Sequence, residues 1–331
     1  MDEHQPIVQC RQLSKVYERR SRSGTWYNPL NWFDYKKENI MGVSQLNFSI
    51  KRGEKVGLLG PNGASKSTFV KLLTGIIKPT EGEILLFGVD PFENRKLCAN
   101  NYGVVFGNRN MLWKHVPVIE SFKLAADIYN IDYDTLQERL DLFDSILGIS
   151  ELLHVAPRKL SFGQRMKCQI SYSLLHLPQI IILDEATIGL DVMVRHKVIE
   201  LLNHLVAEED LTLIITSHLI EDVDRLADRL IILMEGEVNY DGDKAEFMSK
   251  YSQSRQIKAS FLTEIPIEIR QQDIFKQARF ETNIIEIECE PNKVPILIRE
   301  LSGHDELEDI TISEPSLEVI LRQVFQENGQ Q

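Results

Sequence analysis

The sequence predicts an α/β fold with a largely parallel sheet, followed by a small second α/β domain. Three observations support this prediction: apolar strand-like runs alternate with helical patterns, a glycine-rich turn joins one strand to a helix near residue 60, and a polar stretch near residue 250 precedes a new series of strands and helices. The 331 residues are 43% hydrophobic, which is enough apolar material for sizeable cores.

The first part of the chain is expected to hold strands and one helix. Residues 7–17 alternate as a strand does, whereas residues 18–40 are polar, basic and then aromatic, without clear periodicity, and indicate an inserted loop. Strand patterns follow at 43–50 and 55–60, and the pattern over 66–74 predicts a helix that ends at a glycine.

The middle of the chain changes to helices and then returns to strands. A strand is predicted at 83–87, and residues 109–178 form a helical insert. The apolar positions that recur at helical spacing in this insert, and predict a buried helix face, are Leu136, Leu140, Phe143 and Leu147. Further strands at 179–183, 212–216 and 229–234 are separated by helices at 192–206 and 220–227.

The polar stretch SKYSQSRQ, which begins at Ser249, marks a domain boundary. We therefore expect one domain over 1–250 and a second over 251–331. In the second domain the pattern predicts strand, helix, strand, helix, strand and helix, with Pro315 opening the last helix. This part of the sequence carries no chemical motif that we recognise.

Composition narrows the class of protein. There are 37 Lys and Arg against 49 Asp and Glu, a formal charge of −12, which argues against a nucleic-acid partner because phosphate contacts need cations. No apolar run approaches the roughly 18 residues that span a bilayer, and the N-terminus lacks the apolar core of a signal peptide. We expect a cytoplasmic protein. The scattered cysteines, which form no CxxC pair and fit a reducing compartment, are Cys10, Cys98, Cys168 and Cys289.

A phosphate-binding loop is the first chemical motif. Residues 57–68 read GLLGPNGASKST between a strand and a helix. In such a loop small residues let main-chain amides wrap the β-phosphate, a lysine reaches the β- and γ-oxygens, and a hydroxyl binds Mg²⁺. A chance glycine-rich turn is the alternative, and the flanking strand and helix argue against it. The candidate nucleotide-binding residues of this loop are Gly60, Pro61, Asn62, Gly63, Ala64, Ser65, Lys66, Ser67 and Thr68.

Ser65 departs from the usual loop pattern, which has glycine at this position. If the backbone there needs a glycine-only conformation, strain of about 1–3 kcal/mol follows. Alternatively, Ser65 adopts ordinary helical geometry and its hydroxyl adds a phosphate contact. Lys66 and Ser67 match the usual pattern. The hypothesis is therefore that the chain binds nucleotide, but more weakly than a loop with glycine at position 65.

An acidic pair follows the apolar run at 180–183. Carboxylates at the C-terminal edge of a parallel strand face the crevice where ligands bind. Asp184 is therefore a candidate to hold Mg²⁺, and Glu185 a candidate to polarise an attacking water. Solvated loop charges are the alternative, which the upstream phosphate loop makes the weaker one.

The order of motifs resembles that of the ATP-binding subunits of ABC transporters. LSFGQ at 160–164 is similar to the family signature, LDEATIGLD at 183–191 to the Walker B and D-loop, and TSH at 216–218 to the switch histidine. The resemblance covers about residues 7–245. This resemblance implies a P-loop ABC-type ATPase domain with a mixed sheet core and a helical insert. Within the family, the chain looks like a member of the exporter branch for drugs, antibiotics or polysaccharides.

The resemblance implies a nucleotide sandwiched between two subunits. The Tyr17 ring would stack on adenine, and His218 would contact the γ-phosphate beside the catalytic Glu185. The residues that would act across the dimer interface are Ser161, Gly163, Gln164 and Asp191. The implied cofactors are ATP and Mg²⁺. The implied partners are a transmembrane permease and a second copy or a similar ATPase subunit, at the inner face of the cell membrane.

Two further positions depart from the family pattern. Asn108 stands where the family usually has a glutamine that contacts the metal and the permease, so the expected metal-site residues are Ser67, Asn108 and Asp184. Phe162 stands where the signature usually has glycine. Together Ser65 and Asn108 lead to a hypothesis of slow hydrolysis.

Three functions stay open at the level of sequence: a transport motor, a soluble ABC ATPase acting on ribosomes or DNA, and a regulatory nucleotide-binding subunit with little turnover. The acidic charge and the single ATPase cassette favour the first over the second. Four aromatic residues of the early insertion either contact a permease or membrane or pin the loop to its own domain. They are Trp26, Tyr27, Trp32 and Phe33.

Overall fold

A computed structural model describes residues 5–22, 35–61, 63–107, 109–217, 219–251 and 254–328. The four aromatic residues of the early insertion lie outside these ranges. The chain divides into two compact units, 1–242 and 243–331. The division falls before the composition change at residue 250, because α9 (Lys244–Tyr251) contacts the C-terminal helix α12 (Leu317–Asn328) within the second unit.

A six-stranded sheet forms the centre of the first unit, in the order β5-β6-β7-β3-β8-β9. The pairs from β5 to β8 are parallel, as the alternation of strands and helices predicts. The strands are β3 (Lys55–Leu59), β5 (Tyr102–Phe106), β6 (Ile180–Asp184), β7 (Thr212–Thr216), β8 (Arg229–Met234) and β9 (Glu237–Asp243).

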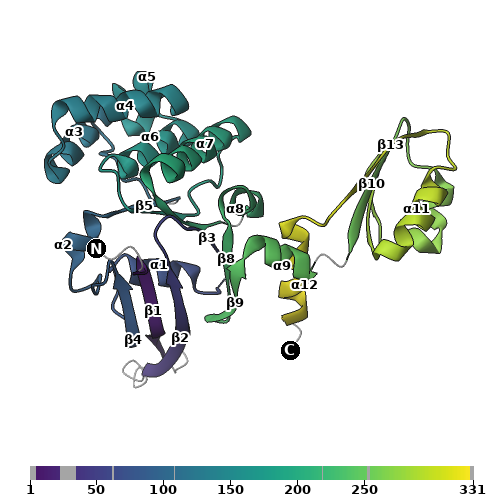
Figure 1. The fold of residues 1–331 in the computed structure, drawn as a ribbon, viewed down its shortest axis with the longest axis horizontal. Helices are drawn as coiled ribbons and strands as arrows, with labels where there is room; N and C mark the ends of the chain where they lie inside the picture. Colours follow the sequence, from purple (N-terminus) through teal and green to yellow (C-terminus); the bar gives the residue numbers. More distant parts are fainter. Residues whose placement is uncertain are drawn as a thin grey trace, which may run out of the picture. The chain divides into compact units, whose positions relative to one another are not determined.

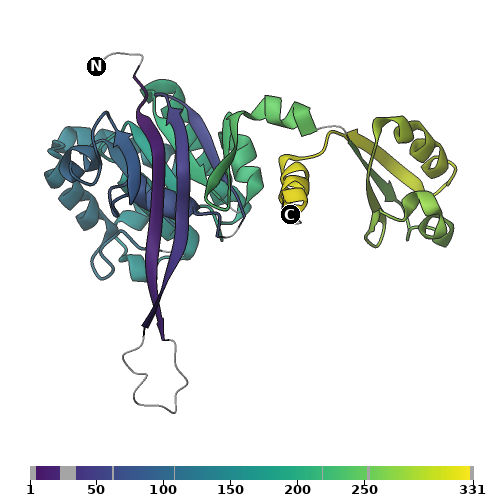
Figure 2. The same ribbon diagram turned by 90° about the horizontal axis from the view of Figure 1, so that it is seen from below.

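A second sheet in this unit is antiparallel, in the order β2-β1-β4, with β1 at Val8–Arg22, β2 at Tyr35–Ile50 and β4 at Glu81–Leu86. The prediction of a loop over 18–40 is wrong at both of its ends, since the pairing continues from Glu18↔Asn39 to Arg22↔Tyr35. Figure 2 shows the two long strands running side by side as one ribbon. Main-chain hydrogen bonds hold such a ladder without an apolar alternation, so periodicity could not reveal it.

Helices α3 to α6 gather on one side of the unit (Figure 1). The insert face predicted to be buried is confirmed: Phe143 and Leu147 of α4 are fully buried. The helices are α1 (Lys66–Leu73), α2 (Arg95–Ala99), α3 (Val118–Tyr129), α4 (Tyr133–Leu147), α5 (Ser150–Leu153), α6 (Phe162–Leu174), α7 (Val192–Glu209) and α8 (Ile220–Leu226). A 3₁₀ turn at Pro157–Lys159 precedes α6.

The second unit contains a four-stranded antiparallel sheet in the order β11-β12-β10-β13. Its elements follow one another as strand, helix, strand, strand, helix and strand, the succession of ferredoxin-like folds. They are β10 (Arg255–Phe261), α10 (Ile267–Gln271), β11 (Arg279–Phe280), β12 (Ile284–Cys289), α11 (Val294–Leu301) and β13 (Leu307–Ser313), with 3₁₀ turns at Asp273–Phe275 and Pro291–Lys293. Alternate residues of β12, Ile285 and Ile287, are buried against the helices.

In the ranges that the structure describes, no helix combines the length and the apolar character needed to cross a lipid bilayer.

Candidate functional site

The loop between β3 and α1 has a backbone that glycine makes possible. Gly60 has φ +154°, and a Cβ there would stand 2.2 Å from the carbonyl oxygen of Leu233. Gly63 has φ +85° and open space around it. Glycine at these positions therefore lets the chain turn tightly under β8 and leaves the main chain of the loop accessible.

The sequence left two conformations open for Ser65, one typical of glycine and one ordinary helical. Ser65 adopts the first, which is strained for a residue with a Cβ. Its φ of 76° and ψ of 13° lie in the left-handed region, at the N-cap of α1. The side chain makes no capping hydrogen bond, and its hydroxyl is 3.4 Å from the carbonyl oxygen of Gly63, to which it donates. A left-handed conformation costs a residue with a Cβ about 1–2 kcal/mol, so the loop stores strain where related loops have glycine.

Lys66 is held against the loop. Its side chain is buried, with only 7% of the residue exposed, and Nζ donates to the carbonyl oxygens of Gly60 at 2.6 Å and Pro61 at 3.1 Å. Burial lowers the pKa of the ammonium, and the charges of Glu185 and Asp184 act in the opposite direction. The lysine is thus a desolvated cation whose nearest acceptors are carbonyl oxygens.

The two carboxylates at the end of β6 are positioned by β7. Thr216 donates its hydroxyl to Asp184 Oδ1 at 2.6 Å, and the Glu185 N–H donates to the carbonyl oxygen of Thr216 at 2.9 Å. Burial raises the pKa of Asp184, the Thr216 hydrogen bond lowers it, and the neighbouring Glu185 raises it. Glu185 has φ 56°, so a second residue of this site with a Cβ is left-handed.

A cavity of 320 Å³ brings the loop, Glu185 and Tyr17 together. Tyr17 lies at one wall, where its hydroxyl is 3.5 Å from Thr68 Oγ1 and its ring fits against Gly42. Ile40 and Met41 also line the cavity and are about half exposed, at 44% and 54%. Sequence reasoning missed these two residues, because it assigned Ile40 to a loop and gave Met41 no role.

The chemistry of the donor set fits a hard cation. Ser67 lines the cavity, and Asp184 contributes a half-buried carboxylate whose charge Lys66 and Lys71 partly offset. Mg²⁺ takes oxygen ligands, is usually bound through one or two carboxylates, and receives its other ligands from substrate phosphates and water. No group of three or more His, Cys, Asp or Glu within the described residues could hold a metal, and this kind of site does not need one.

The signature segment lies at the start of α6 and does not line this cavity. Ser161 is the N-cap: its Oγ accepts from the Gln164 N–H at 3.2 Å, and Gln164 Oε1 accepts from the Ser161 N–H at 2.9 Å. Gly163 faces Asp191, since a Cβ there would be 3.7 Å from Asp191 Oδ2. Asp191 itself caps α7 by accepting from the Val194 N–H at 2.9 Å.

Phe162 joins the signature to the segment after Glu185. A Cβ on Gly189, which has φ +80°, would lie 3.4 Å from the Phe162 ring. The Arg165 guanidinium lies 5.6 Å from the centroid of the same ring. The aromatic ring that replaces the usual glycine is therefore accommodated by contacts within the same chain.

The structure thus brings one group of predicted residues together and places another group elsewhere. The first group comprises Tyr17, Gly63, residues 65–68 and Glu185, which line the cavity, together with Gly60, Pro61 and Asp184 beside Lys66. The second comprises Ser161, Gly163, Gln164 and Asp191. Three predicted residues, Asn62, Asn108 and His218, lie outside the described ranges.

Comparison with known proteins assigns this arrangement to a family. The family model described as ABC transporter matches residues 43–188. The chain is 30% identical over 210 residues to the ABC transporter ATP-binding protein NatA of Bacillus subtilis, an alignment that covers 63% of this chain and 85% of NatA. It is 32% identical over 199 residues to the bacitracin transport ATP-binding protein BcrA of Bacillus licheniformis, covering 59% of this chain and 63% of BcrA.

The chain is also similar to the methionine import ATP-binding protein MetN of Helicobacter pylori. The identity is 26% over 248 residues, which cover 73% of this chain and 69% of MetN. Among solved structures, the chain is similar to a dimeric post-hydrolysis state of the ATP-binding cassette MJ0796 bound to ADP and Pi. The identity is 25% and the TM-score 0.60, with 72% of this chain and 98% of that chain covered. The chain therefore belongs to the ABC transporter family and is one of its ATP-binding proteins.

Proposed function

We propose that this chain is the ATP-hydrolysing subunit of a transporter and that a separate membrane permease uses the energy it releases. One observation carries the proposal: the phosphate loop and Glu185 line one cavity, with Asp184 close to Lys66, while the signature segment of the same chain lies elsewhere. A single copy therefore offers two halves of a nucleotide site that do not meet within it.

The loop half would grip the triphosphate. The main-chain amides around Gly60 and Gly63 and the N-terminus of α1 favour phosphate oxygens. A phosphate oxygen would replace the two carbonyl oxygens as the acceptor of the Lys66 ammonium. Its negative charge would stabilise the buried ammonium better than neutral carbonyl oxygens do. Tyr17, Ile40 and Met41 would form an apolar wall for the base.

Mg²⁺ fits the oxygen donors of Ser67 and Asp184, and when bound it neutralises charge on the β- and γ-phosphates. Thr216 would keep Asp184 in place through the 2.6 Å hydrogen bond. The charge of the metal would also remove the penalty that burial imposes on the ionised carboxylate.

The other half-site would come from a second copy or a similar subunit. Ser161 and Gly163 stand at the N-terminus of α6, where helix amides and the helix dipole favour an anion. Asp191 lies beside Gly163 and would act at the same interface. The hydroxyl of Ser161 and the amide of Gln164 already bond each other's main chain, so ATP would bind a preformed helix start.

Hydrolysis would proceed by attack of water on the γ-phosphorus, in line with the bond to the β-γ bridging oxygen. Glu185 would accept a proton from the water, the new P–O bond would form, and the bridging oxygen would leave with its electron pair on ADP. Lys66 would stabilise the charge on the γ-phosphate oxygens. His218 is the sequence-based candidate for a further γ-phosphate contact.

The permease partnership is supported by the family and by two relatives, which are named for the transport of bacitracin and the import of methionine. We propose that the chain works at the inner face of the cell membrane through that partner. Export is the direction that the motif resemblance implies. Accumulation or efflux of labelled compounds in vesicles that contain both subunits would measure the direction directly.

The experiment that tests the proposal measures the oligomeric state of the Glu185→Gln variant in the presence of ATP and Mg²⁺. We expect a monomer to become a dimer in analytical ultracentrifugation, and we expect the wild-type chain purified from membranes to bring a polytopic protein with it. A chain that stays monomeric with ATP, both alone and with membrane protein present, contradicts the proposal.

One observation favours a second candidate, a nucleotide-binding regulatory subunit with little turnover. It is the left-handed Ser65 in the phosphate loop, because strain there opposes the conformation that grips phosphate. Steady-state phosphate release separates the two candidates: wild-type release no higher than that of a blank without protein identifies the regulatory subunit.

A further inference from the structure

A cavity of 360 Å³ in the first unit is lined by four cationic side chains and, among the described residues, by no carboxylate. The cations come from the loop between β5 and α3, from the 3₁₀ turn before α6, and from α6 itself. They are Arg109, Lys114, Arg158 and Arg165. Four positive charges without a negative one give the lining a charge of +4, although the whole chain has a formal charge of −12. Cavities of about 300–1,000 Å³ are typical of small-molecule sites.

These four charges are not balanced by neighbouring side chains. Within the part of the chain that the structure describes, none of the four forms an ion pair. Arg229 of the same unit shows the usual arrangement, because carboxylate oxygens of Glu54 and Asp241 lie 2.7 Å from its guanidinium. Like charges that share a cavity repel one another, so an anion that entered this cavity would relieve the repulsion.

Two of the four cations lie against aromatic rings. The Arg165 guanidinium is 5.6 Å from the centroid of the Phe162 ring, and the Arg109 guanidinium is 5.6 Å from that of Phe106. A contact of this kind stabilises a cation without neutralising its charge. Phe162, which departs from the usual signature, therefore holds a cation at this cavity.

The loop that carries Arg109 and Lys114 is fixed by hydrogen bonds from Gln169 and from the turn before α6. The Met111 N–H donates to Gln169 Oε1 at 2.8 Å, and the Arg158 N–H donates to the carbonyl oxygen of Lys114 at 3.4 Å. The cations are thus presented by segments that already hold one another in place, as in a preorganised binding site.

Gln169 also brings a hydrogen-bond donor to the lining. The residue is only 2% exposed, and its Nε2 donates to Met166 Sδ at 3.9 Å. A thioether sulfur is a weak acceptor, and the amide nitrogen carries two N–H groups. A buried donor with so weak a partner favours an oxygen acceptor in the cavity, which is the same preference that the four cations express.

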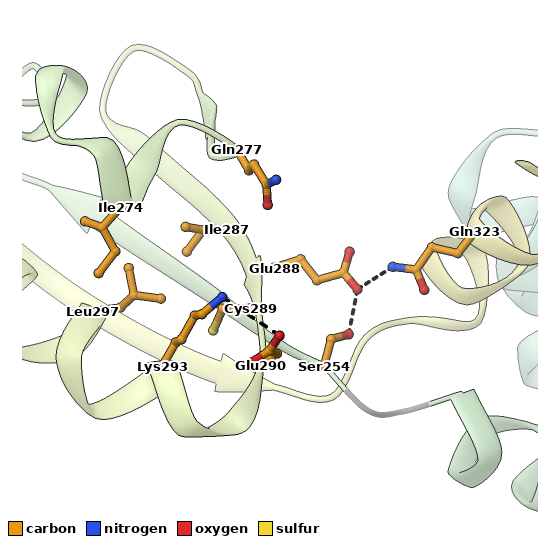
Figure 3. A pocket seen from close by; sticks show the side chains of 10 residues that line it. All are labelled: Ser254, Ile274, Gln277, Ile287, Glu288, Cys289, Glu290, Lys293, Leu297 and Gln323. Atoms are coloured by element: carbon orange, nitrogen blue, oxygen red, sulfur yellow. Dashed lines mark hydrogen bonds and ion pairs between the residues drawn. The ribbon is translucent and has the colours of Figure 1, made fainter. Parts of the chain in front are cut away.

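A larger cavity of 410 Å³ in the second unit lacks this imbalance (Figure 3). The cation of its described lining, Lys293, stands 3.9 Å from Oε1 of Glu290. The carboxylate of Glu288 accepts hydrogen bonds from Ser254 and Gln323. The charged side chains of that lining therefore have partners within the chain, whereas those of the first cavity do not.

We propose that the cationic cavity binds a small polyanion that carries adjacent phosphate groups. The guanidinium groups of Arg158 and Arg165 donate to phosphate oxygens, for which their planar fork is suited, and Gln169 Nε2 donates to a further oxygen. Four cations around 360 Å³ call for several negative charges in a small volume. Adjacent phosphates provide that density, whereas an acidic peptide carries one carboxylate per side chain.

The site is separate from both halves of the proposed ATP site. Neither the phosphate loop nor the signature residues Ser161, Gly163 and Gln164 line this cavity. The proposal therefore does not depend on ATP hydrolysis, and its test does not require it.

The test is isothermal titration calorimetry of the full chain with inorganic pyrophosphate, at low salt and with a chelator that removes divalent cations. The chain carries Lys66→Met, which removes the cation of the phosphate loop and with it the other site for pyrophosphate. We expect saturable binding of one pyrophosphate per chain. Arg158→Gln and Arg165→Gln should each weaken this binding about tenfold or more, because each removes a charged donor.

Lys159→Gln is the matched control. Lys159 is exposed, follows Arg158 directly and does not line the cavity, so its loss changes the net charge equally and should leave the affinity almost unchanged. The affinity should fall with added salt, and less steeply in Arg158→Gln than in Lys159→Gln.

Three results would overturn the proposal. The first is the absence of saturable pyrophosphate binding to the Lys66→Met chain. The second is equal affinity in Arg158→Gln and Lys159→Gln. The third is a glutamate-rich peptide that binds where pyrophosphate does not, which would assign the cavity to an acidic segment of a protein partner.

Discussion

The two halves of the proposed nucleotide site solve the same task, binding an anion at a helix N-terminus, in opposite ways. At α1 the phosphate loop places Ser65 in a left-handed conformation and leaves it without a side-chain cap. At α6 the signature begins with a capping box, in which Ser161 and Gln164 bond each other's main chain. The first helix start carries strain, whereas the second is satisfied before any ligand arrives.

The ionisable residues of the two halves also differ: those of the loop half are removed from water, whereas that of the signature half is exposed. Lys66 is buried and Asp184 is half-buried, and this burial lowers the pKa of Lys66 and raises the pKa of Asp184, so it favours the neutral form of both. Asp191, in contrast, accepts a main-chain hydrogen bond near the surface. We infer that the loop half is unfavourable on its own and gains most from Mg²⁺ and ATP, while the signature half is a stable surface that recognises the finished complex.

The largest expected effect comes from the carboxylate that would accept the proton of water. Glu185→Gln should lower ATP turnover about 10²–10⁴-fold and leave ATP binding intact, because the amide keeps the size of the side chain but is no base. Single-turnover phosphate release measures it. Glu208→Gln, an exposed carboxylate on α7, is the control. If the wild-type chain hydrolyses ATP above background and Glu185→Gln does so at the same rate, Glu185 has no part in the chemistry.

The second effect tests whether the loop half is strained by its own charges. Asp184→Asn should raise the melting temperature of the nucleotide-free chain at pH 7 by a few degrees, since it removes a half-buried charge and the amide oxygen still accepts from Thr216. The folded pKa of Asp184 is raised above the ordinary value, so the folded state binds more protons than the unfolded state in the window between the two values.

The sign of the pH dependence follows. Wild type gains stability from Asp184 as the pH falls through the raised pKa, and the gain is complete below the ordinary value of 3.8. The advantage of Asp184→Asn should therefore shrink as the pH falls. Glu185, Lys66 and Lys71 face Asp184 and stay unchanged in the variant. A destabilised variant, or an advantage that does not depend on pH, would contradict the inferred strain.

Sequence alone located most of the loop half because its chemistry is local. Gly60, Lys66, Ser67 and the carboxylates after β6 stand at fixed spacings next to a strand or helix, and the structure places them around one cavity or beside it. The conformation of Ser65 could not be predicted. The left-handed φ depends on how the loop turns under β8, which no spacing of residue types encodes.

Contacts between distant segments were also beyond the sequence. Ile40 and Met41 reach the cavity because β2 pairs with β1 beyond the apolar part of both strands. The packing of Phe162 on Gly189 depends on how α6 meets the segment after Glu185. The division of the chain at residue 242 likewise follows the contact of α9 with α12, whereas composition changes only near residue 250.

The third prediction concerns the signature half. Ser161→Ala removes the side-chain acceptor of the capping box and should cost about 1 kcal/mol of unfolding free energy in the chain without nucleotide. Asp132→Ala, which removes the cap of α4 at Thr135, should cost a similar amount. Urea unfolding measures both.

The two cap variants should behave differently when ATP is added. Only Ser161→Ala should weaken ATP-dependent dimerisation, because Asp132 caps a helix whose start lies outside both groups of site residues. Equal dimerisation of the two variants in sedimentation would show that the signature helix start is structural only.

The smallest expected effect is that of a glycine substitution in the phosphate loop. It tests the difference between the two helix starts directly, because the same substitution inside another helix should have the opposite sign. Ser65→Gly should stabilise the nucleotide-free chain by about 0.5–1 kcal/mol, since glycine adopts the left-handed region freely and this gain exceeds its cost in chain entropy. Ser145→Gly, at an exposed position inside α4, should instead destabilise by about the same amount. Tighter ATP binding should accompany Ser65→Gly alone, because relaxing the loop favours the conformation that wraps phosphate. If both glycine variants destabilise the chain, Ser65 is unstrained and the phosphate loop is as well satisfied as the signature.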